Sequence, residues 1–442
     1  MINKTSTQLQ LGIYSVYDDQ LNAKHPLFKL SKAIDWTVFE KTFSKHYSTK
    51  MGKPAKPIRL MVSLLILKQV RNLSDESVVE QWAENVYYQY FSGQVHFVPM
   101  PPCVPTELVE FRKRIGNEGI ELIFKESIKV NGRDADDDNL SADTTIQEKN
   151  ITYPTDDKLY KKVIKECRAI AEDEQISLRQ SYTRTIKKLS TTQRFKKTKK
   201  GAVNARKASK RVKTIAGVLV RELKRKLPAD RLSQHSLKLS IYQKVLAQKR
   251  SDSQKIYSIH EPQVKCYTKG KEHKKYEFGS KVSILVTQNT GVIVGALNFN
   301  STEHDSKTIE KTVAQYEKLT DKTAKNIYVD RGYRGISKIG ETAILVPKTD
   351  KNISQQRRKG HSRRAAIEPV ISHLKSNYRL GRNYLKGIIG DEINVLLSAA
   401  AMNFKRVMNL WLTEAIFRWE LILKIILNVS KKNIAQILNP TF

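Results

Sequence analysis

The sequence contains few cysteines and no long uninterrupted apolar run, and each shortage excludes a class of protein. Its three cysteines stand far apart and form no CxxC pair; they are Cys103, Cys167 and Cys266. This spacing argues against zinc modules and disulfide-rich secreted scaffolds, so we expect a reducing compartment. The first twenty residues have no apolar core of signal-peptide length, and charged residues interrupt the apolar stretch at 415–427. We therefore expect a soluble, intracellular protein.

Two common catalytic motifs are also missing. No GxxxxGK[ST] motif occurs, and the glycines of DRGYRG (330–335) are too few and wrongly placed for a phosphate-binding P-loop. SIHEPQ (258–263) places one histidine beside one glutamate but lacks the second histidine of a helical zinc-protease motif. The sequence thus gives no reason to invoke ATP or a zinc hydrolase.

Basic residues dominate instead. The 442 residues include 79 Lys or Arg against 44 Asp or Glu, for a net charge of +35, and 40% of the chain is hydrophobic. This length and composition predict two or three domains with a substantial core. So large a positive charge indicates a polyanionic partner, because each neutralised phosphate releases condensed counterions. Nucleic acid is the first candidate and a membrane surface the second.

Residues 1–137 are expected to be helical. The nearly continuous apolar run 60–70 suits a buried helix, and Ser74 is a candidate N-cap for the next one. In that second helix an apolar residue recurs at every fourth position, at Val78, Trp82, Val86 and Tyr90. After a cluster of prolines, Thr106 can cap a third helix, whose basic residues are Arg112, Lys113 and Arg114. A helical DNA-binding region and a plain helical packing domain both remain open.

A first strand is predicted at 139–146, within the short segment 138–157. The next segment, 158–255, holds 29 Lys or Arg against 7 Asp or Glu, and 194–213 holds ten basic residues and no acid. We expect helices joined by a basic, mobile stretch that contacts DNA, although such charge runs are more often simply solvated. The candidate DNA contacts are Arg194, Lys196, Lys197, Lys199 and Lys200.

Residues 256–410 change to strand patterns. A hairpin is predicted from 281–287 and 292–297, joined by a turn at 289–291. Asp305 is placed to cap a helix from 306 to about 319, and short apolar strands follow at 326–330 and 343–347. Strands with an intervening helix imply an α/β fold with a mixed sheet. The tail, 411–442, is expected to be helical.

Three carboxylates occupy positions suited to chemistry. Asp143 lies in the first strand, Asp330 closes a later strand, and Glu368 begins a helical segment whose Pro369 suits a first turn. Gathered together, they would suit Mg²⁺, and two such ions can assist in-line displacement at a phosphodiester. In the alternative, all three are structural: Asp143 is a turn residue, Asp330 forms a local Asx turn, and Glu368 is an acid at a helix N-terminus that interacts favourably with the helix dipole.

The helix that starts near Glu368 strengthens the catalytic interpretation. If it persists, Lys375, Arg379 and Arg382 fall on the same face as Glu368. Residues 357–386 contain nine basic residues and one acid, Glu368. A carboxylate followed by cations on one helix face suits a metal ligand beside a DNA backbone, whereas simple charge compensation is the weaker alternative.

Four ordered motifs carry a family resemblance. They are SADTTIQEKNITYPTD around Asp143, HKKYEFGSKVSI from His273, YVDRGYRG around Asp330, and RRAAIEPVISHLKSNYRLGRNYLKG around Glu368. Together they resemble the DDE transposases of bacterial insertion sequences, in the IS-five-like branch, over most of residues 50–410. The family's signature has Tyr, Arg, Glu and Lys at fixed spacings. This chain keeps Arg364, Glu368 and Lys375 but has His361 in place of the tyrosine.

The resemblance implies an RNase H-like core, interrupted by the basic helical segment between its first strand and the hairpin. It implies that Asp143, Asp330 and Glu368 are catalytic metal ligands for two Mg²⁺ ions, which Mn²⁺ can replace, and that Arg364 and Lys375 contact phosphate. It further implies a homodimer or higher oligomer on double-stranded DNA, acting in the bacterial cytoplasm in association with the nucleoid. The expected reaction is cleavage at the element's ends followed by strand transfer. An RNase H-like nuclease without strand transfer and a non-catalytic DNA-binding derivative are the alternatives.

Overall fold

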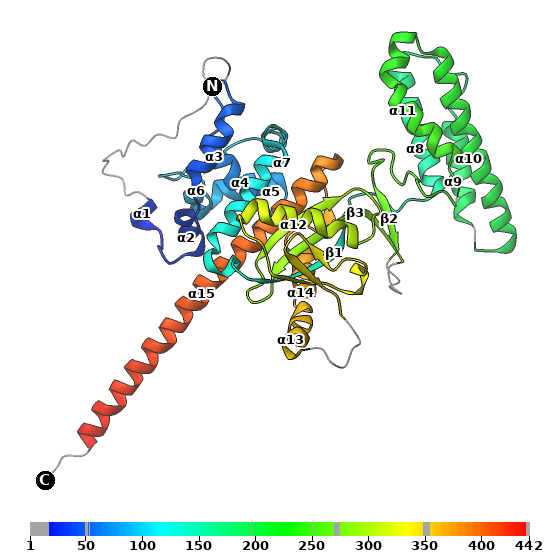
Figure 1. The fold of residues 1–442 in the computed structure, drawn as a ribbon. Helices are drawn as coiled ribbons and strands as arrows, with labels where there is room; N and C mark the ends of the chain where they lie inside the picture. The colour runs from blue at the N-terminus through cyan, green and yellow to red at the C-terminus, as the bar shows by residue number, and fades with distance from the viewer. Residues whose placement is uncertain are drawn as a thin grey trace.

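The computed structural model describes residues 17–48, 52, 54–195, 197–249, 251–268, 275–347 and 354–438, with side chains up to residue 413. Figure 1 shows a main body, built from the N-terminal helices, a sheet and the C-terminal helix, and a separate helical bundle drawn in green. The bundle leaves the main body after the first strand and returns before the second. This is the position predicted for the basic insertion.

The sheet is mixed, as the sequence predicts. Its strands are β1 (Asn139–Lys149), β2 (Lys265–Thr268), β3 (Tyr276–Thr287), β4 (Ile293–Phe299), β5 (Asn326–Tyr328), β6 (Lys338–Ile339), β7 (Thr342–Leu345) and β8 (Arg382–Asn383). The order β4-β3-β1-β5-β7 forms its main path, with β2 pairing to β3, β6 to β7, and β8 to β1. β1 is antiparallel to β3 and parallel to β5, while β5 is parallel to β7. The change from antiparallel to parallel neighbours therefore falls at β1.

Local sequence explains the long central hairpin. The β-branched run of β3 is buried on most of its length, and the turn before β4 includes Gly291 at φ +71°. Gly279 permits the close approach of β3 to β1, because a Cβ there would lie 1.8 Å from the carbonyl oxygen of Gln147. The predicted hairpin is confirmed.

The N-terminal region is helical, as expected. Its elements are α1 (Tyr17–Gln20), α2 (Pro26–Ala33), α3 (Trp36–Phe43), η1 (Ser44–His46), α4 (Ile58–Val70), α5 (Asp75–Glu84), α6 (Val86–Phe91), α7 (Pro105–Val130) and η2 (Gly132–Ala135). Twelve of the thirteen residues of α4 are buried. Ser74 caps α5 by accepting a hydrogen bond from the Ser77 amide, as predicted.

Two expectations about these helices are wrong. The apolar stripe 78–90 does not lie on one helix, because Asn85 ends α5 and caps α6 by accepting from the amides of Tyr87 and Tyr88. Thr106 does not cap α7. That helix starts one residue earlier, at Pro105, whose missing N–H is tolerated in a first turn, and Val104 is its N-cap residue.

The N-terminal helices and the sheet share one hydrophobic core. Buried side chains from Leu27 to Ile128 are continuous with those of the strands and of α15 (Gly387–Leu438). α15 packs against α4, α7 and β4, and its Asn403 side chain bonds both the amide and the carbonyl of Ile293, at 2.9 and 2.8 Å. The N-terminal region therefore folds as part of the main body.

The bundle has a hydrophobic core of its own. It comprises α8 (Asp156–Asp173), α9 (Thr183–Arg194), α10 (Lys199–Lys226) and α11 (Ala229–Ala247), and its core includes Val163, Leu219 and Tyr242. The expected mobile basic stretch is mostly helix, since α10 runs through the basic residues 199–213. Ala205, Ala208 and Val212 of this stretch are buried at helical spacing, which explains why it is ordered.

The remaining helices cover the sheet. α12 (Ser306–Thr320) packs against β3 and β4, and α14 (Ile367–Asn377) packs against β1, while α13 (Gln355–Arg364) contacts both β1 and β5. The expected tail helix is the end of α15, which runs to Leu438. Within the described residues no helix is long and apolar enough to cross a membrane.

Candidate active site

The topology brings Asp143 and Asp330 to the same edge of the sheet. β1 and β5 are parallel neighbours, and their last paired residues are Ser141 and Tyr328. Asp143 lies two residues further along β1, which continues to Lys149, and Asp330 lies two residues beyond Tyr328, so the two carboxylates stand at the same level of neighbouring strands. Ligands of open α/β sheets bind at such carboxyl ends, where the strand order changes direction.

Local hydrogen bonds orient both carboxylates. Asp143 Oδ1 accepts from the Thr144 amide at 2.7 Å, and its side chain is 22% exposed. Asp330 Oδ1 accepts from the Gly332 amide at 2.9 Å and so caps the short helix η3 (Arg331–Tyr333). The Asx turn considered as an alternative is therefore present at Asp330, and it fixes the carboxylate near the strand end.

Tyr333 lies among the carboxylates. It is fully buried, and its pKa is raised well above its ordinary value, first by burial and then by the charges of Asp143, Asp305 and Asp330. Its hydroxyl has no hydrogen-bond partner of good geometry in the described part of the chain, although Thr308 lies close by. Three aspartates thus approach one buried ring.

Asp305 has a role that the sequence did not predict. It precedes α12, as expected for a cap, but its side chain makes no capping hydrogen bond. Its Oδ1 instead accepts from Thr144 Oγ1 at 2.8 Å and from Lys281 Nζ at 2.7 Å. The only sequence signal, an aspartate before a helix, equally fits a cap, so this network could not be read from it.

Glu368 lies where the sequence places it along the chain, in the first turn of α14, but its side chain is exposed. Within the described ranges, no three His, Cys, Asp or Glu side chains lie close enough together to hold a metal ion. The structure therefore brings Asp143 and Asp330 together, with Asp305 nearby, and does not gather the predicted triad into one cluster.

Arg364 faces the first aspartate. At the end of α13, its Nη1 lies 3.6 Å from Asp143 Oδ2, and the Arg364 side chain is 18% exposed. His361, one turn earlier, packs edge-on against the ring of Tyr328 with centroids 5.2 Å apart. Burial, followed by the charges of Arg357 and Arg364, lowers the pKa of His361. His361 therefore lies beside the site as a neutral packing residue near neutral pH.

The predicted ladder of cations on the Glu368 helix is wrong beyond Lys375. α14 ends at Asn377, and Arg379 has left-handed backbone at φ +65°. The turn is closed by hydrogen bonds from the Leu380 amide to the Leu374 carbonyl and from the Gly381 amide to the Lys375 carbonyl. A Cβ at Gly381 would lie 2.6 Å from that last oxygen, so only glycine fits this turn without a shift.

The residues beyond the turn have other partners. Arg379 Nη1 donates to the Asn72 carbonyl at 3.2 Å, and its guanidinium lies 5.2 Å from the ring centroid of Tyr384. Arg382, in β8, donates from Nε to Asn150 Oδ1 at 2.8 Å. Lys375 is half-buried on α14.

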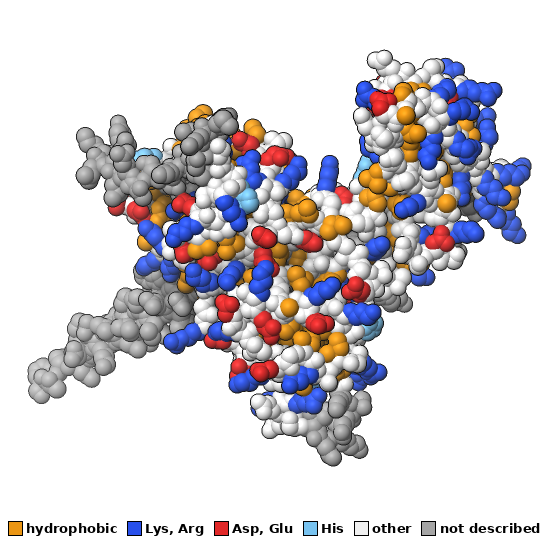
Figure 2. Space-filling model, turned by 45° about the horizontal axis from the view of Figure 1, so that its top comes forward, with side chains coloured by type: hydrophobic (Ala, Val, Ile, Leu, Met, Phe, Trp, Pro, Cys, Tyr) orange, Lys and Arg blue, Asp and Glu red, His pale blue; other side chains and the backbone are white. Residues whose placement is uncertain are grey.

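The candidate DNA contacts of the bundle that the structure describes are exposed. Arg194 ends α9, while Lys197, Lys199 and Lys200 lie at or before the start of α10, and all four are exposed. Lys196 lies outside the described residues. Lys and Arg side chains are dense over the bundle in Figure 2, with few acidic side chains among them. Arg112 differs, since it is buried and paired with Asp75.

Comparisons with known proteins agree with this arrangement. Residues 15–114 match a transposase domain (DUF772), and residues 249–404 match a transposase DDE domain. The second match spans Asp330 and Glu368, whereas β1 and most of the bundle lie between the two. The chain is similar to an uncharacterized protein, ORF8 in the nfe locus of Rhizobium meliloti, with 38% identity over 182 residues, covering 40% of this chain and 87% of that protein. No solved structure matches the chain.

The two domain matches together span the N-terminal helices and the greater part of the sheet. The mixed sheet, with Asp143 on its central strand β1 and Asp330 just after the neighbouring parallel strand β5, fits an RNase H-like catalytic core. The chain belongs to the DDE transposase family.

Proposed function

We propose that this protein binds the ends of an insertion sequence, hydrolyses a phosphodiester at each end and transfers the freed 3′-hydroxyl to target DNA. The observation that carries the proposal is that Asp143, within β1, and Asp330, just after β5, lie at the same level of two parallel neighbouring strands. A basic bundle, emerging from the chain just after β1, supplies a surface for the DNA backbone.

The side chains present fit a divalent metal in their chemistry. Mg²⁺ takes oxygen ligands and is commonly held by one or two carboxylates together with substrate phosphates. Asp143 and Asp330 supply two carboxylates close enough that both raise the pKa of Tyr333. We propose that these two aspartates would hold Mg²⁺, with Glu368 completing the site on DNA. When bound, the ions would polarise the scissile phosphate and lower the pKa of an attacking water.

The chain's own residues would prepare this chemistry. Arg364 Nη1 lies 3.6 Å from Asp143 Oδ2, and substrate phosphate would compete with that carboxylate for the guanidinium. The ammonium of Lys281 neutralises Asp305 and so limits repulsion among the three aspartates. In-line attack by water, and then by the 3′-hydroxyl, needs no covalent bond to the protein.

Other features belong to the same proposal. The four motifs support the IS-five-like branch, and the charge of +35 supports association with the nucleoid. We propose action as a homodimer or higher oligomer, because two element ends must be processed together. Exposed cations of the N-terminal helices, such as Lys113, are candidates for additional DNA contacts.

A strand-transfer assay tests the proposal. Purified protein is incubated with a labelled, precut element end, a supercoiled target plasmid and Mg²⁺ or Mn²⁺, and joined products are resolved on a gel. We expect joined products that disappear when the metal is chelated. Cleavage of uncut ends without joining would identify a nuclease, and end binding without either reaction would identify a non-catalytic derivative.

A further inference from the structure

A cavity of about 570 Å³ lies at the junction of the main body and the bundle. One wall comes from the start of α8 and the segment 257–261, and the other from the end of β1 and the segment 383–387. Its polar lining includes Lys149, Lys158, Lys162, His260, Tyr384 and Lys386. Both lobes of the protein therefore contribute to one basic cavity.

This cavity has a net positive charge. Lys149 is paired with two acids, since its Nζ lies 2.6 Å from Asp391 Oδ1 and 3.4 Å from Glu261 Oε2, and these three groups together leave one negative charge, which the three other lysines outweigh. Lys158, Lys162 and Lys386 form no ion pair with an acid in the described part of the chain. Lys158 donates only to the carbonyl of Tyr153, at 3.0 Å. The cavity thus presents positive charge that a ligand can neutralise.

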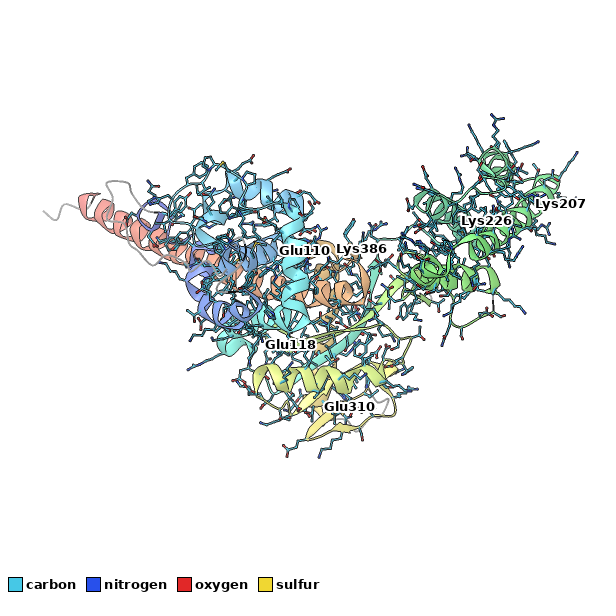
Figure 3. All side chains as sticks on the ribbon, turned by 90° about the horizontal axis from the view of Figure 1, so that it is seen from above. Glu110, Glu118, Lys207, Lys226, Glu310 and Lys386 are labelled. Carbon is cyan, nitrogen blue, oxygen red and sulfur yellow. The ribbon has the colours of Figure 1, made fainter. Side chains whose placement is uncertain are left out.

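The two key lysines come from different lobes. Lys162 belongs to α8 of the bundle, and Lys386 immediately precedes α15 of the main body. Figure 3 shows Lys386 on the side of the main body toward the bundle. A linear polyanion passing between the lobes would meet both.

An exposed aromatic ring adjoins these cations. Tyr384 is 56% exposed, and the guanidinium of Arg379 lies over its ring at 5.2 Å. Exposed aromatic rings among cations are typical of surfaces that bind nucleic acid, where the ring contacts a sugar or a base and the cations contact phosphate.

The distance to the active site suits one continuous DNA molecule. Lys149 lines the cavity at the end of β1, six residues after Asp143 in the same strand. A strand rises by about 3.3 Å per residue, so the two positions lie about 20 Å apart. Along B-DNA, with about 3.4 Å between successive base pairs, this corresponds to roughly six base pairs.

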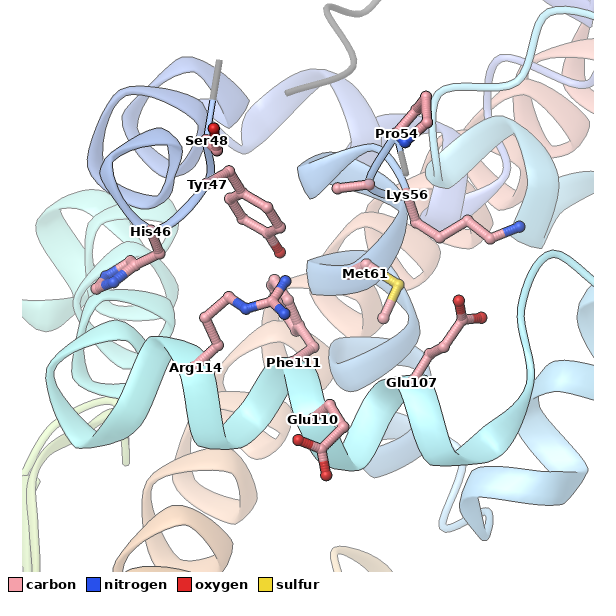
Figure 4. A pocket seen from close by; sticks show the side chains of 11 residues that line it. His46, Tyr47, Ser48, Pro54, Lys56, Met61, Glu107, Glu110, Phe111 and Arg114 are labelled. Carbon is pink, nitrogen blue, oxygen red and sulfur yellow. The ribbon is translucent and has the colours of Figure 1, made fainter. Parts of the chain in front are cut away.

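A second cavity, between η1, α4 and α7, offers a contrast. Its volume is about 360 Å³, and its lining combines Lys56 and Arg114 with Glu107 and Glu110 (Figure 4). Two cations opposed by two acids provide no net attraction for a polyanion. The junction cavity is the better phosphate site.

We propose that the junction cavity binds the phosphate backbone of the element-end DNA about six nucleotides from the scissile phosphate, with Lys162 of the bundle and Lys386 of the main body both contacting it. This inference rests on the proposed function, since it assumes that the scissile phosphate lies at Asp143 and Asp330. If the inference holds, the bundle and the main body both contact the same DNA segment.

Phosphate ethylation interference tests the inference. Labelled element ends carrying one ethylated phosphate per strand are bound by wild type, by Lys162→Gln/Lys386→Gln, and by the control Lys311→Gln/Lys338→Gln. The control removes the same charge from exposed positions of α12 and β6, outside the bundle. Melting temperature verifies the fold of each variant.

In wild type we expect interference at phosphates about six nucleotides from the cut. It should vanish in Lys162→Gln/Lys386→Gln and persist in the control, and the salt slope of binding should fall by roughly one to two units. An unchanged pattern, in an end that wild type binds and cuts, would overturn the cavity assignment alone. Failure of wild type to bind or cut any end would overturn the proposed function and this inference together.

Discussion

Arg112 offers a direct test of whether α7 serves structure or DNA binding. Its Nη1 and Nη2 donate to the two oxygens of Asp75 at 2.8 and 2.6 Å, and Lys68 donates to the same carboxylate at 2.8 Å. All three side chains are at most 14% exposed. Breaking a buried pair of this kind by removing one partner destabilises a protein by about 3–5 kcal/mol. We expect Arg112→Gln to lose stability on that scale.

The control lies next to it in sequence. Lys113 pairs with Glu110 on the surface, with side chains 68% and 63% exposed, so Lys113→Gln should change stability by less than about 0.5 kcal/mol. Urea unfolding measures the loss, and DNA affinity is measured on the folded fraction. Wild-type stability combined with weakened DNA binding in Arg112→Gln would refute the structural role.

The same cluster predicts a pH dependence. Burial alone would raise the pKa of Asp75, but hydrogen bonds from Arg112 and the charge of Lys68 lower it to about 2 from an ordinary 3.8. When folding lowers the pKa of a carboxyl group, the resulting stabilisation is fully present at pH values above the pKa of the unfolded state. It is lost as the pH falls through the pKa of the folded state. The shift corresponds to roughly 2 kcal/mol. This contribution should disappear between about pH 4 and pH 2, and be absent from Asp75→Asn.

Three further predictions concern other parts of the protein. In the first, five basic residues of the bundle are changed to Gln, namely Arg194, Lys196, Lys197, Lys199 and Lys200. The free energy of unfolding should stay within about 1 kcal/mol of wild type, because the four of these side chains that the structure describes are exposed, and nonspecific DNA affinity at low salt should fall at least about tenfold. Loss of the fold with unchanged DNA affinity would contradict this prediction. Lys375→Ala should weaken end binding, slow cleavage and reduce the salt slope by roughly one unit; an unchanged slope would exclude a phosphate contact. Gly381→Ala should destabilise the fold by about 1–3 kcal/mol, because its Cβ would lie 2.6 Å from the Lys375 carbonyl oxygen, and a melting temperature equal to wild type would show that the turn relaxes freely.

Local sequence patterns predicted most elements of the main body. The β-branched runs of β1, β3 and β4, and the cap at Ser74, each depend on residues close in sequence. Such signals survive folding because neighbouring residues and burial favour the same conformation. The parallel pairing of β1 with β5 then places Asp143 and Asp330 together, which the strand positions and the family resemblance had suggested.

Prediction failed where distant residues compete for a side chain or a backbone group. The Asp305 side chain accepts hydrogen bonds from Thr144 and Lys281, which lie 161 and 24 residues away in sequence, and does not cap α12. Arg112 was counted among the basic residues of a helix that could bind DNA, and its pairing was missed because its partner, Asp75, lies 37 residues away on another helix. The end of α14 was missed because Arg379 adopts left-handed backbone without a glycine at that position. None of these outcomes has a local pattern.

The rate of end cleavage by variants of the three predicted catalytic acids tests the central claim most directly. Asp143→Ala, Asp330→Ala and Glu368→Ala are compared with Glu341→Ala, an exposed acid of the main body, on a labelled element end with Mg²⁺. Each of the first three should slow cleavage at least about a hundredfold with DNA affinity retained, because loss even of outer-shell partners of a metal costs ten- to hundredfold. Cleavage near the wild-type rate in Asp143→Ala or Asp330→Ala would contradict the assigned active site, whereas the same result in Glu368→Ala alone would remove only that residue from it.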